Sequence, residues 1–322
     1  MVTHTFQDDK NILGRFAVLL QKGRLAHAYL FVGPGQSGKT ATALAIAKLI
    51  NCEQNMDGRQ AAGCDRCPSC LKINAGHHVD VSIIDSGEDP TIKIARIREL
   101  IGRMQLRPFE ARKKVYIIKK VEELTLEGGN ALLKTLEEPT DNSLLILTTS
   151  VPEKIIATIR SRCHTVNFFP AADDVIFEQI RKDGGYGRDE ARFLAHFAQG
   201  CLGRARQLGQ SGFLQRKNEA IDRFVMEKNS DDYIKEVAAD KELTKEFLGV
   251  LLSWFRDIAL LKAGMDKERF AHADRIRDLV AAAPRYTQAQ VMDIIAQIVN
   301  ASNMLAENLN VKIPLSLLKE KI

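Results

Sequence analysis

The sequence predicts an α/β domain built on a doubly wound parallel sheet, followed by a region that is helical throughout. Two observations support this prediction. Over roughly the first 168 residues, short continuous apolar runs alternate with helical segments, a pattern typical of parallel strands covered on both faces. After Phe169 and Pro170 the strand signals stop, and only helical periodicity remains.

The expected elements follow in order along the chain. The strand candidates are 28–32, 79–84, 114–118, 144–148 and 164–168. The helix candidates between them are 40–51, 92–105, 129–138 and 152–160. Next, the segments 173–182, 188–199 and 204–209 predict a small helical bundle. The longest helix is expected over 241–261, where apolar side chains recur at steps of three and four residues.

A phosphate-binding loop is predicted between the first strand and the first helix of the sheet domain. Residues 33–40 complete the GxxxxGK[ST] pattern in the strand–loop–helix context that it needs. Backbone N–H groups of such a loop converge on phosphates, its lysine adds a positive charge, and its threonine hydroxyl is available to Mg²⁺. The residues expected to bind ATP or ADP are Gly33, Gly35, Gly38, Lys39 and Thr40.

The strand that should complete an ATPase site ends in residues that do not suit hydrolysis. Lys119 and Lys120 follow the apolar run 115–118, where a working P-loop ATPase carries acids. A lysine ammonium has donors and no acceptor, so it neither ligates Mg²⁺ nor takes a proton from water. We expect Glu122 and Glu123 to lie too far along the following turn to replace those acids. The sequence predicts a site that holds a nucleotide without hydrolysing it.

Four of the six cysteines form a candidate metal site. Cys52, Cys64, Cys67 and Cys70 follow the P-loop helix, and two residues separate each of the last three from the next. In a reducing compartment this density favours a metal over disulfides. Four thiolates give Zn²⁺ a closed tetrahedral shell with a structural role. An iron–sulfur cluster is the alternative, although Pro68 stands inside the cysteine run rather than after it.

Length and composition fit a cytoplasmic protein of two or three domains. The chain has 322 residues, and its 45% of hydrophobic residues suffices for more than one core. A net charge of +5 is compatible with a polyanionic partner without requiring one. No window approaches the ~18 apolar residues of a membrane span, and residues 1–10 lack the apolar core of a signal peptide. Cys163 and Cys201 are expected to be buried small apolar residues.

Several segments resemble the delta-prime subunits of bacterial replicative clamp loaders, which are AAA+ proteins of DNA polymerase III. These segments are residues 23–31, the four-cysteine insertion, residues 130–139 and Ser161-Arg162-Cys163. The resemblance covers the whole chain and implies its domain organisation. The implied domains are an AAA+ domain over 1–168 with a zinc-module insertion at 52–70, a helical lid domain over 169–210 and a helical collar domain over 211–322.

The resemblance also implies a function and a set of partners. The chain would help load a sliding clamp onto primed DNA within a hetero-oligomer of gamma/tau and delta subunits, assembled through the collar and without a membrane. Most of the motifs are shared with the gamma/tau ATPase motor, which is the alternative. Lys119, Lys120 and the lack of a long tau tail favour delta-prime. So does Gly203, which stands where the motor has an arginine that reaches its own γ-phosphate, whereas the intact P-loop points the other way.

In this family the arginine of the Ser-Arg-Cys motif reaches into the nucleotide site of a neighbouring subunit. The resemblance therefore implies that Arg162 is a catalytic arginine finger in trans, since a guanidinium can bracket γ-phosphate oxygens. The alternative is a surface arginine at a helix C-terminus. A second basic feature, with Lys93, Arg96 and Arg103 near one helix face, is equally compatible with contacts to DNA phosphates and with a solvated surface.

Overall fold

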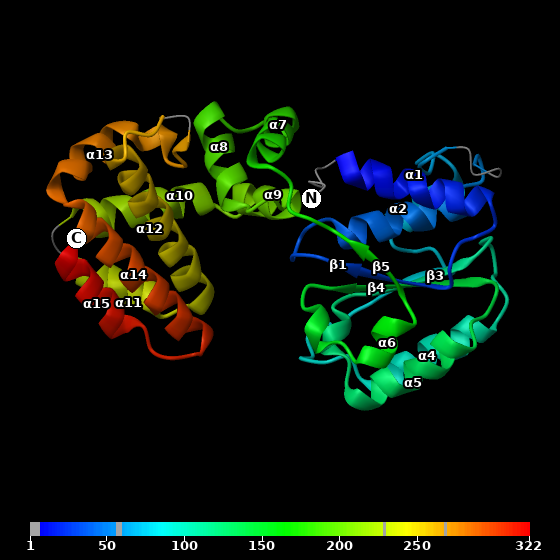
Figure 1. Cartoon of the computed structure of the whole chain (residues 1–322). Coiled ribbons are helices and arrows are strands. Elements are labelled where there is room, and N and C mark those ends of the chain that lie inside the picture. Colours follow the sequence, from blue (N-terminus) through cyan, green and yellow to red (C-terminus); the bar gives the residue numbers. More distant parts are fainter. Residues whose placement is uncertain (1–6, 56–59, 228–229, 267–268) are drawn as a thin grey trace. The chain divides into compact units, whose positions relative to one another are not determined.

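The computed structural model describes residues 7–55, 60–227, 230–266 and 269–322, with side chains from residue 12 onward. Residues 56–59 of the cysteine segment and the first six residues lie outside the described part. The chain divides into two compact units, residues 1–175 with 200–203 and residues 176–199 with 204–322 (Figure 1).

The first unit is built on a five-stranded sheet with the order β2-β3-β4-β1-β5. Its strands are β1 (Ala28–Val32), β2 (Val81–Ile84), β3 (Lys114–Ile118), β4 (Ser143–Thr149) and β5 (His164–Asn167). All four neighbouring pairs are parallel. The predicted parallel sheet is thereby confirmed, and the carboxyl ends of its strands lie at one edge.

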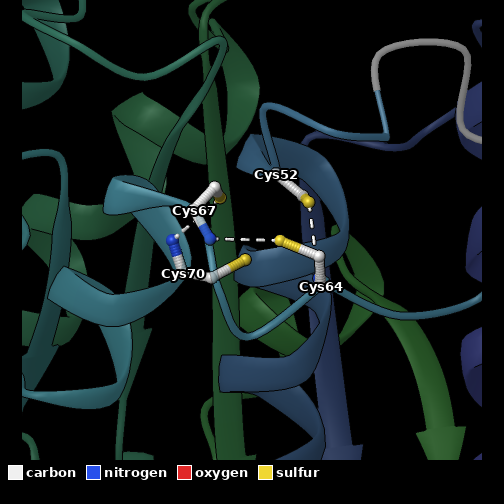
Figure 2. Close-up of side chains that lie close together, drawn as sticks. All are labelled: Cys52, Cys64, Cys67 and Cys70. Atoms are coloured by element: carbon white, nitrogen blue, oxygen red, sulfur yellow. Dashed lines mark hydrogen bonds between the residues drawn. The ribbon is translucent and has the colours of Figure 1, made fainter.

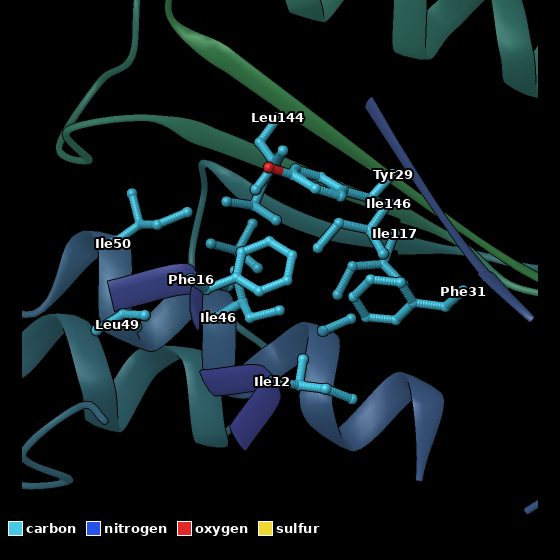
Figure 3. Close-up of a cluster of buried hydrophobic side chains, with 14 of the residues drawn as sticks. Ile12, Phe16, Tyr29, Phe31, Ile46, Leu49, Ile50, Ile117, Leu144 and Ile146 are labelled. Atoms are coloured by element: carbon cyan, nitrogen blue, oxygen red, sulfur yellow. The ribbon is translucent and has the colours of Figure 1, made fainter. Parts of the chain in front are cut away.

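Alternate residues of the strands face two separate layers of helices. On one face Tyr29, Phe31 and Ile117 pack against α1 (Gln7–Gln21) and α2 (Lys39–Asn51) (Figure 3). On the opposite face, Leu30, Ile118 and their neighbours pack against α4 (Ile94–Gln105), α5 (Leu126–Glu137) and α6 (Ala157–Ser161). The period of two along each strand fixes which side chains enter which layer.

Three helical segments of this unit differ from the prediction. Helices α1 and α3 (Pro68–Asn74) were not predicted. The segment expected as one helix over 152–160 consists of a short turn, Pro152–Lys154, followed by α6. Ile155 separates the two, because its backbone is extended and its side chain is buried.

The second unit is helical over its described residues, as predicted. Its helices are α7 (Asp173–Asp183, whose first turn belongs to the first unit), α8 (Arg188–Phe197), α9 (Leu202–Gln210, whose first two residues belong to the first unit), α10 (Phe213–Glu219), α11 (Asp231–Ala238), α12 (Lys241–Lys262), α13 (Ile276–Ala282), α14 (Gln288–Ala306) and α15 (Lys312–Lys321). The long helix α12 packs against α14. Of its predicted apolar face, Phe247, Trp254 and Ile258 are buried, while Leu243 stays partly exposed. None of the described helices is long and apolar enough to cross a membrane.

Candidate functional site

The P-loop connects β1 to α2 at the carboxyl edge of the sheet, and glycine is required at two of its positions. Gly38, which precedes α2, has a φ of 92°, a left-handed conformation that favours glycine. A Cβ on Gly33 would lie 2.4 Å from the Phe168 carbonyl oxygen. The Gly33 N–H donates to the Thr149 carbonyl at the end of β4 (3.2 Å), which fixes the start of the loop beside that strand.

Lys39 lies inside this loop. Its side chain is buried, and Nζ donates to the carbonyl oxygens of Gly33 (2.7 Å) and Pro34 (2.5 Å). Burial lowers the pKa of Lys39, and the nearby charges of Cys201 and Glu122 oppose that shift. The ammonium is thus centred in the loop, where its charge would meet a bound phosphate.

The two lysines after β3 point to acids rather than into the P-loop. Lys119 Nζ lies 2.8 Å from an Asp85 carboxylate oxygen, and Lys120 Nζ lies 2.9 Å from Glu123 Oε1. The hydrogen bond from Lys119 lowers the pKa of Asp85, and the bond to Glu123 raises the pKa of Lys120. Neither lysine presents an acceptor to a metal ion or to water.

Glu122 differs from our expectation that it lies too far along the turn. The short helical turn Val121–Glu123 directs its carboxylate to the end of β4, where the Ser150 N–H and Oγ both donate to Oε1 at 3.3 Å. Its Oε2 atom is buried and has no hydrogen-bond partner among the described residues. Since Thr149 binds the first residue of the P-loop, this carboxylate lies beside the phosphate-binding loop.

Arg162 ends α6 and is partly exposed. Its guanidinium lies 2.7 Å from Glu137 Oε1 and donates to the Thr158 carbonyl at 3.1 Å. Glu137 belongs to α5, so two elements hold the arginine at the surface of the first unit. An exposed ion pair of this kind is weak and exchanges readily for another anion.

Position 203 faces the P-loop and carries no side chain. A Cβ on Gly203 would lie 2.9 Å from the Gln36 carbonyl oxygen. The next residue, Arg204, donates to Gln199 Oε1 at 3.2 Å and lies over the Phe197 ring, 5.7 Å from its centroid. The chain therefore has no arginine at the position nearest the loop, and Arg204 has partners within its own helical unit.

The four predicted cysteine ligands converge (Figure 2). The Sγ atoms of Cys52, Cys64, Cys67 and Cys70 all lie within 4.8 Å of one another. Tetrahedral Zn²⁺ with bonds of about 2.3 Å separates its sulfur ligands by roughly 3.8 Å, so this donor set fits the ion. The backbone N–H groups of Arg66 and Cys67 donate to Cys64 Sγ and lower the pKa of Cys64 to about 7. The cluster can bind a structural metal such as zinc.

Three residues that the sequence analysis missed support the cluster. A Cβ on Gly63 would lie 2.9 Å from Cys70 Sγ, so only glycine allows this approach. Asn51 binds the backbone of Arg112 and Lys113 through both atoms of its amide. Arg112 in turn donates to the Cys52 carbonyl at 2.8 Å. These contacts join the cysteine segment to the chain before β3, and no sequence motif signals them.

The basic residues near α4 have acceptors close to them. Lys93 lies 3.0 Å from Asp89, and Arg103 lies 2.8 Å from Glu99. Arg96 donates to the Asp85 carbonyl at 2.5 Å. These contacts favour the solvated surface over a preformed phosphate site.

Comparison with known proteins matches both units to DNA polymerase III. The family model "DNA polymerase III, delta subunit" matches residues 8–172, and "DNA polymerase III, delta subunit, C terminal" matches residues 211–319. DNA polymerase III subunit delta' of Bacillus subtilis (strain 168) is 28% identical over 301 residues, covering 91% of this chain and 89% of that protein. This chain belongs to the delta-prime subunit family of the DNA polymerase III clamp loader.

Outside the delta-prime family, the tau subunits show higher identity over a shorter stretch. DNA polymerase III subunit tau of Escherichia coli (strain K12) is 41% identical over 180 residues, covering 55% of this chain and 27% of that protein. A gamma subunit-related structure from Thermotoga maritima covers 96% of this chain at 18% identity, with a TM-score of 0.48. The delta-prime relationship, in contrast to that with tau, extends over nearly the full length of both chains.

Proposed function

We propose that this delta-prime subunit binds ATP or ADP through its P-loop and does not hydrolyse it. One observation carries the proposal, namely that Lys119 and Lys120 occupy the end of β3 and are held by Asp85 and Glu123. Two ammonium groups at this position offer no ligand to Mg²⁺ and supply no base for the attacking water. The phosphate-binding loop beside them is intact, with Lys39 already centred in it.

The direct test is steady-state ATP turnover by the isolated chain. We expect measurable nucleotide binding and no turnover above background. A rate near the ~1 s⁻¹ low end of ordinary enzymes, lost in Lys39→Ala, would instead identify a gamma/tau-type motor. No binding of either nucleotide would refute the P-loop part of the proposal alone.

This subunit is then expected to contribute to ATP hydrolysis in the site of a neighbouring subunit, through Arg162. Its guanidinium is at the end of a helix, is partly exposed, and is paired with the more exposed Glu137. Exchange of Glu137 for the γ-phosphate of a neighbouring subunit would place a fixed positive charge where negative charge develops in the transition state. A lysine offers no bidentate fork and should replace it poorly.

Reconstitution tests the finger. Complexes of gamma/tau and delta subunits with wild-type or Arg162→Ala chain are assayed for ATPase stimulated by clamp and primed DNA. A finger contributes on the order of 10³-fold at its own site, diluted in a ring with several sites, so we expect a clear fall in kcat with little change in nucleotide affinity. Arg162→Lys should rescue poorly. Arg160→Ala, at an exposed arginine of α6 two residues before Arg162, is the matched control. Wild-type rates from assembled Arg162→Ala complexes would contradict the role.

The chain associates with other DNA polymerase III subunits, and we propose that the helical region 211–322 makes this contact. Met292 and Val299 are exposed seven residues apart on α14, and Ile313 and Leu317 are exposed four residues apart on α15. Each spacing places both side chains on one helix face. Gamma/tau and delta subunits are the proposed partners at the collar, with the sliding clamp and primed DNA bound by the assembled cytoplasmic complex.

We further propose that the four cysteines hold one Zn²⁺ with a purely structural role. The donor set closes the tetrahedron and leaves no position for water, which excludes hydrolytic chemistry at this ion. Arg112 donates to the Cys52 carbonyl, and its own backbone N–H is bound by Asn51. A bound Zn²⁺ would therefore also stabilise the chain just before β3.

A further inference from the structure

The carboxylate of Glu122 is not used by any role described above. It leaves the turn after β3, crosses to the end of β4, and is held there by two donors from Ser150. Its second oxygen, Oε2, is buried and has no hydrogen-bond partner among the residues that the structure describes. Glu123, the next residue, differs in both respects, because Lys120 and Ser86 each donate to its carboxylate.

The surroundings of Glu122 are those of the nucleotide site. Ser150 follows Thr149, whose carbonyl accepts the N–H of Gly33 at the start of the P-loop. The negative charge of Glu122 also raises the pKa of Lys39, which opposes the lowering caused by burial. A buried oxygen acceptor thus lies beside a loop whose Thr40 carries a hydroxyl in the first turn of α2.

We propose that Glu122 is the acid of this nucleotide site and binds the Mg²⁺ of a Mg²⁺–nucleotide, through a water of the metal's shell. The inference rests on the proposed binding of ATP or ADP. Mg²⁺ in nucleotide sites keeps several waters and is held by one or two carboxylates together with the phosphates. The Thr40 hydroxyl and Glu122 Oε2 supply protein oxygens of that kind, whereas Lys119 and Lys120 do not.

This arrangement also accounts for a site that retains its ligand without turnover. A carboxylate whose Oε1 is already fixed by Ser150 can hold a hydrated metal ion in place. The lysines that stand at the end of β3 leave no acid there to orient the attacking water. Glu122 would therefore act in binding rather than in catalysis.

The test measures the affinity of a fluorescent ATP analogue in Mg²⁺ and in EDTA. We expect the wild-type chain to bind about tenfold more tightly in Mg²⁺, and Glu122→Gln to lose most of that factor. In EDTA, Glu122→Gln should bind at least as tightly as wild type, because it removes a negative charge beside the phosphates. Glu123→Gln is the matched control and should keep the wild-type response to Mg²⁺.

Each other outcome overturns the inference in an identifiable way. An unchanged Mg²⁺ factor in Glu122→Gln would show that the carboxylate does not contact the metal shell. Equal weakening in Mg²⁺ and in EDTA would show that Glu122 only anchors the turn to Ser150. If the wild-type chain binds nucleotide with no Mg²⁺ effect, the inference fails and the nucleotide-binding proposal stands; if it binds none, both fail.

Discussion

Two sets of charged groups, one in each unit of this chain, lie in opposite environments. In the first unit, Lys119 and Lys120 keep substantial exposure and pair with acids around the carboxyl edge of the sheet. In the second unit, Lys217, Asp257 and His272 are almost completely buried. Lys217 pairs with Asp274 and lies over the Phe193 ring, and His272 Nε2 lies 2.8 Å from the Ser253 hydroxyl.

The difference shows which charges can change partners. An exposed pair has a small net free energy, so its members can leave one partner for a phosphate or a metal shell. A buried charge that loses its partner remains desolvated at high cost. The exposed pairs of the first unit are therefore suited to binding, and the buried charges of the helical unit to fixing how its helices pack.

The largest expected effect is at the cysteine cluster, where three of the four sulfur ligands are buried and the set is suited to a metal. Cys67→Ser removes one of four thiolates, so we expect about one Zn²⁺ per chain to fall to a small fraction of that. Hydrogen exchange should increase over residues 60–70 while the main sheet stays protected. Metal analysis and exchange measurements check both results, with Cys201→Ala outside the cluster as the control. Iron in the wild-type protein, or full zinc content in Cys67→Ser, would contradict the assignment.

The next effect is expected at the buried ion pair of the helical unit. Lys217→Ala leaves Asp274 without its partner and opens space beside Phe193, so we expect a loss of about 3 kcal/mol in the free energy of unfolding. Lys235→Ala removes a lysine that pairs with Asp232 at the surface and should leave the free energy of unfolding nearly unchanged. Urea unfolding of both variants measures the contrast. Equal losses of unfolding free energy in the two variants would show that the buried pair stabilises the fold no more than the exposed pair.

The features that could be predicted from the sequence are those that depend on residue type at fixed positions. The four cysteines were predicted to the residue because metal binding depends on residue type at fixed spacing, and the structure brings them together. The nucleotide-binding residues of the P-loop were named on the same ground and stay a prediction. The parallel strands were predicted because a strand that is buried on both faces has a continuous apolar sequence. Strand β2 begins at Val81 rather than at Val79, since Asp80 turns inward to accept the backbone N–H groups of 109–111.

What the sequence did not predict depends on where a turn directs a side chain. Glu122 and Glu123 are adjacent acids, yet one faces Ser150 at β4 and the other pairs with Lys120. The positive φ of Lys120, 48°, helps to set that turn, and no residue pattern signals it. The buried charges of the helical unit are not signalled by the sequence either, because helical periodicity marks the apolar face of α12 and does not show that Asp257 is buried with it.

The smallest and most specific effect concerns Asp257. Burial raises the pKa of this carboxyl from its ordinary value near 3.8 to about 6, although the His272 N–H donates to it at 2.8 Å. Between those pH values the folded chain retains a proton that the unfolded chain has lost. The contribution of this group to stability is therefore full below about pH 3.8 and decreases as the pH rises through 6. At about 1.4 kcal/mol per pKa unit, the expected decrease is at most about 3 kcal/mol.

Asp257→Asn should remove that decrease. The amide cannot ionise, and its oxygen still accepts the His272 N–H, so the variant should exceed wild type in unfolding free energy at pH 7.5 and equal it near pH 4. Comparison at each pH cancels the opposite contribution of His272, whose pKa is held low by burial in both proteins. Glu242→Gln, in the exposed first turn of the same helix, should show no such pH dependence. A variant that is less stable than wild type at every pH would show that the ionised carboxylate is needed to hold the His272 backbone, and that this buried charge stabilises the helical unit instead of straining it.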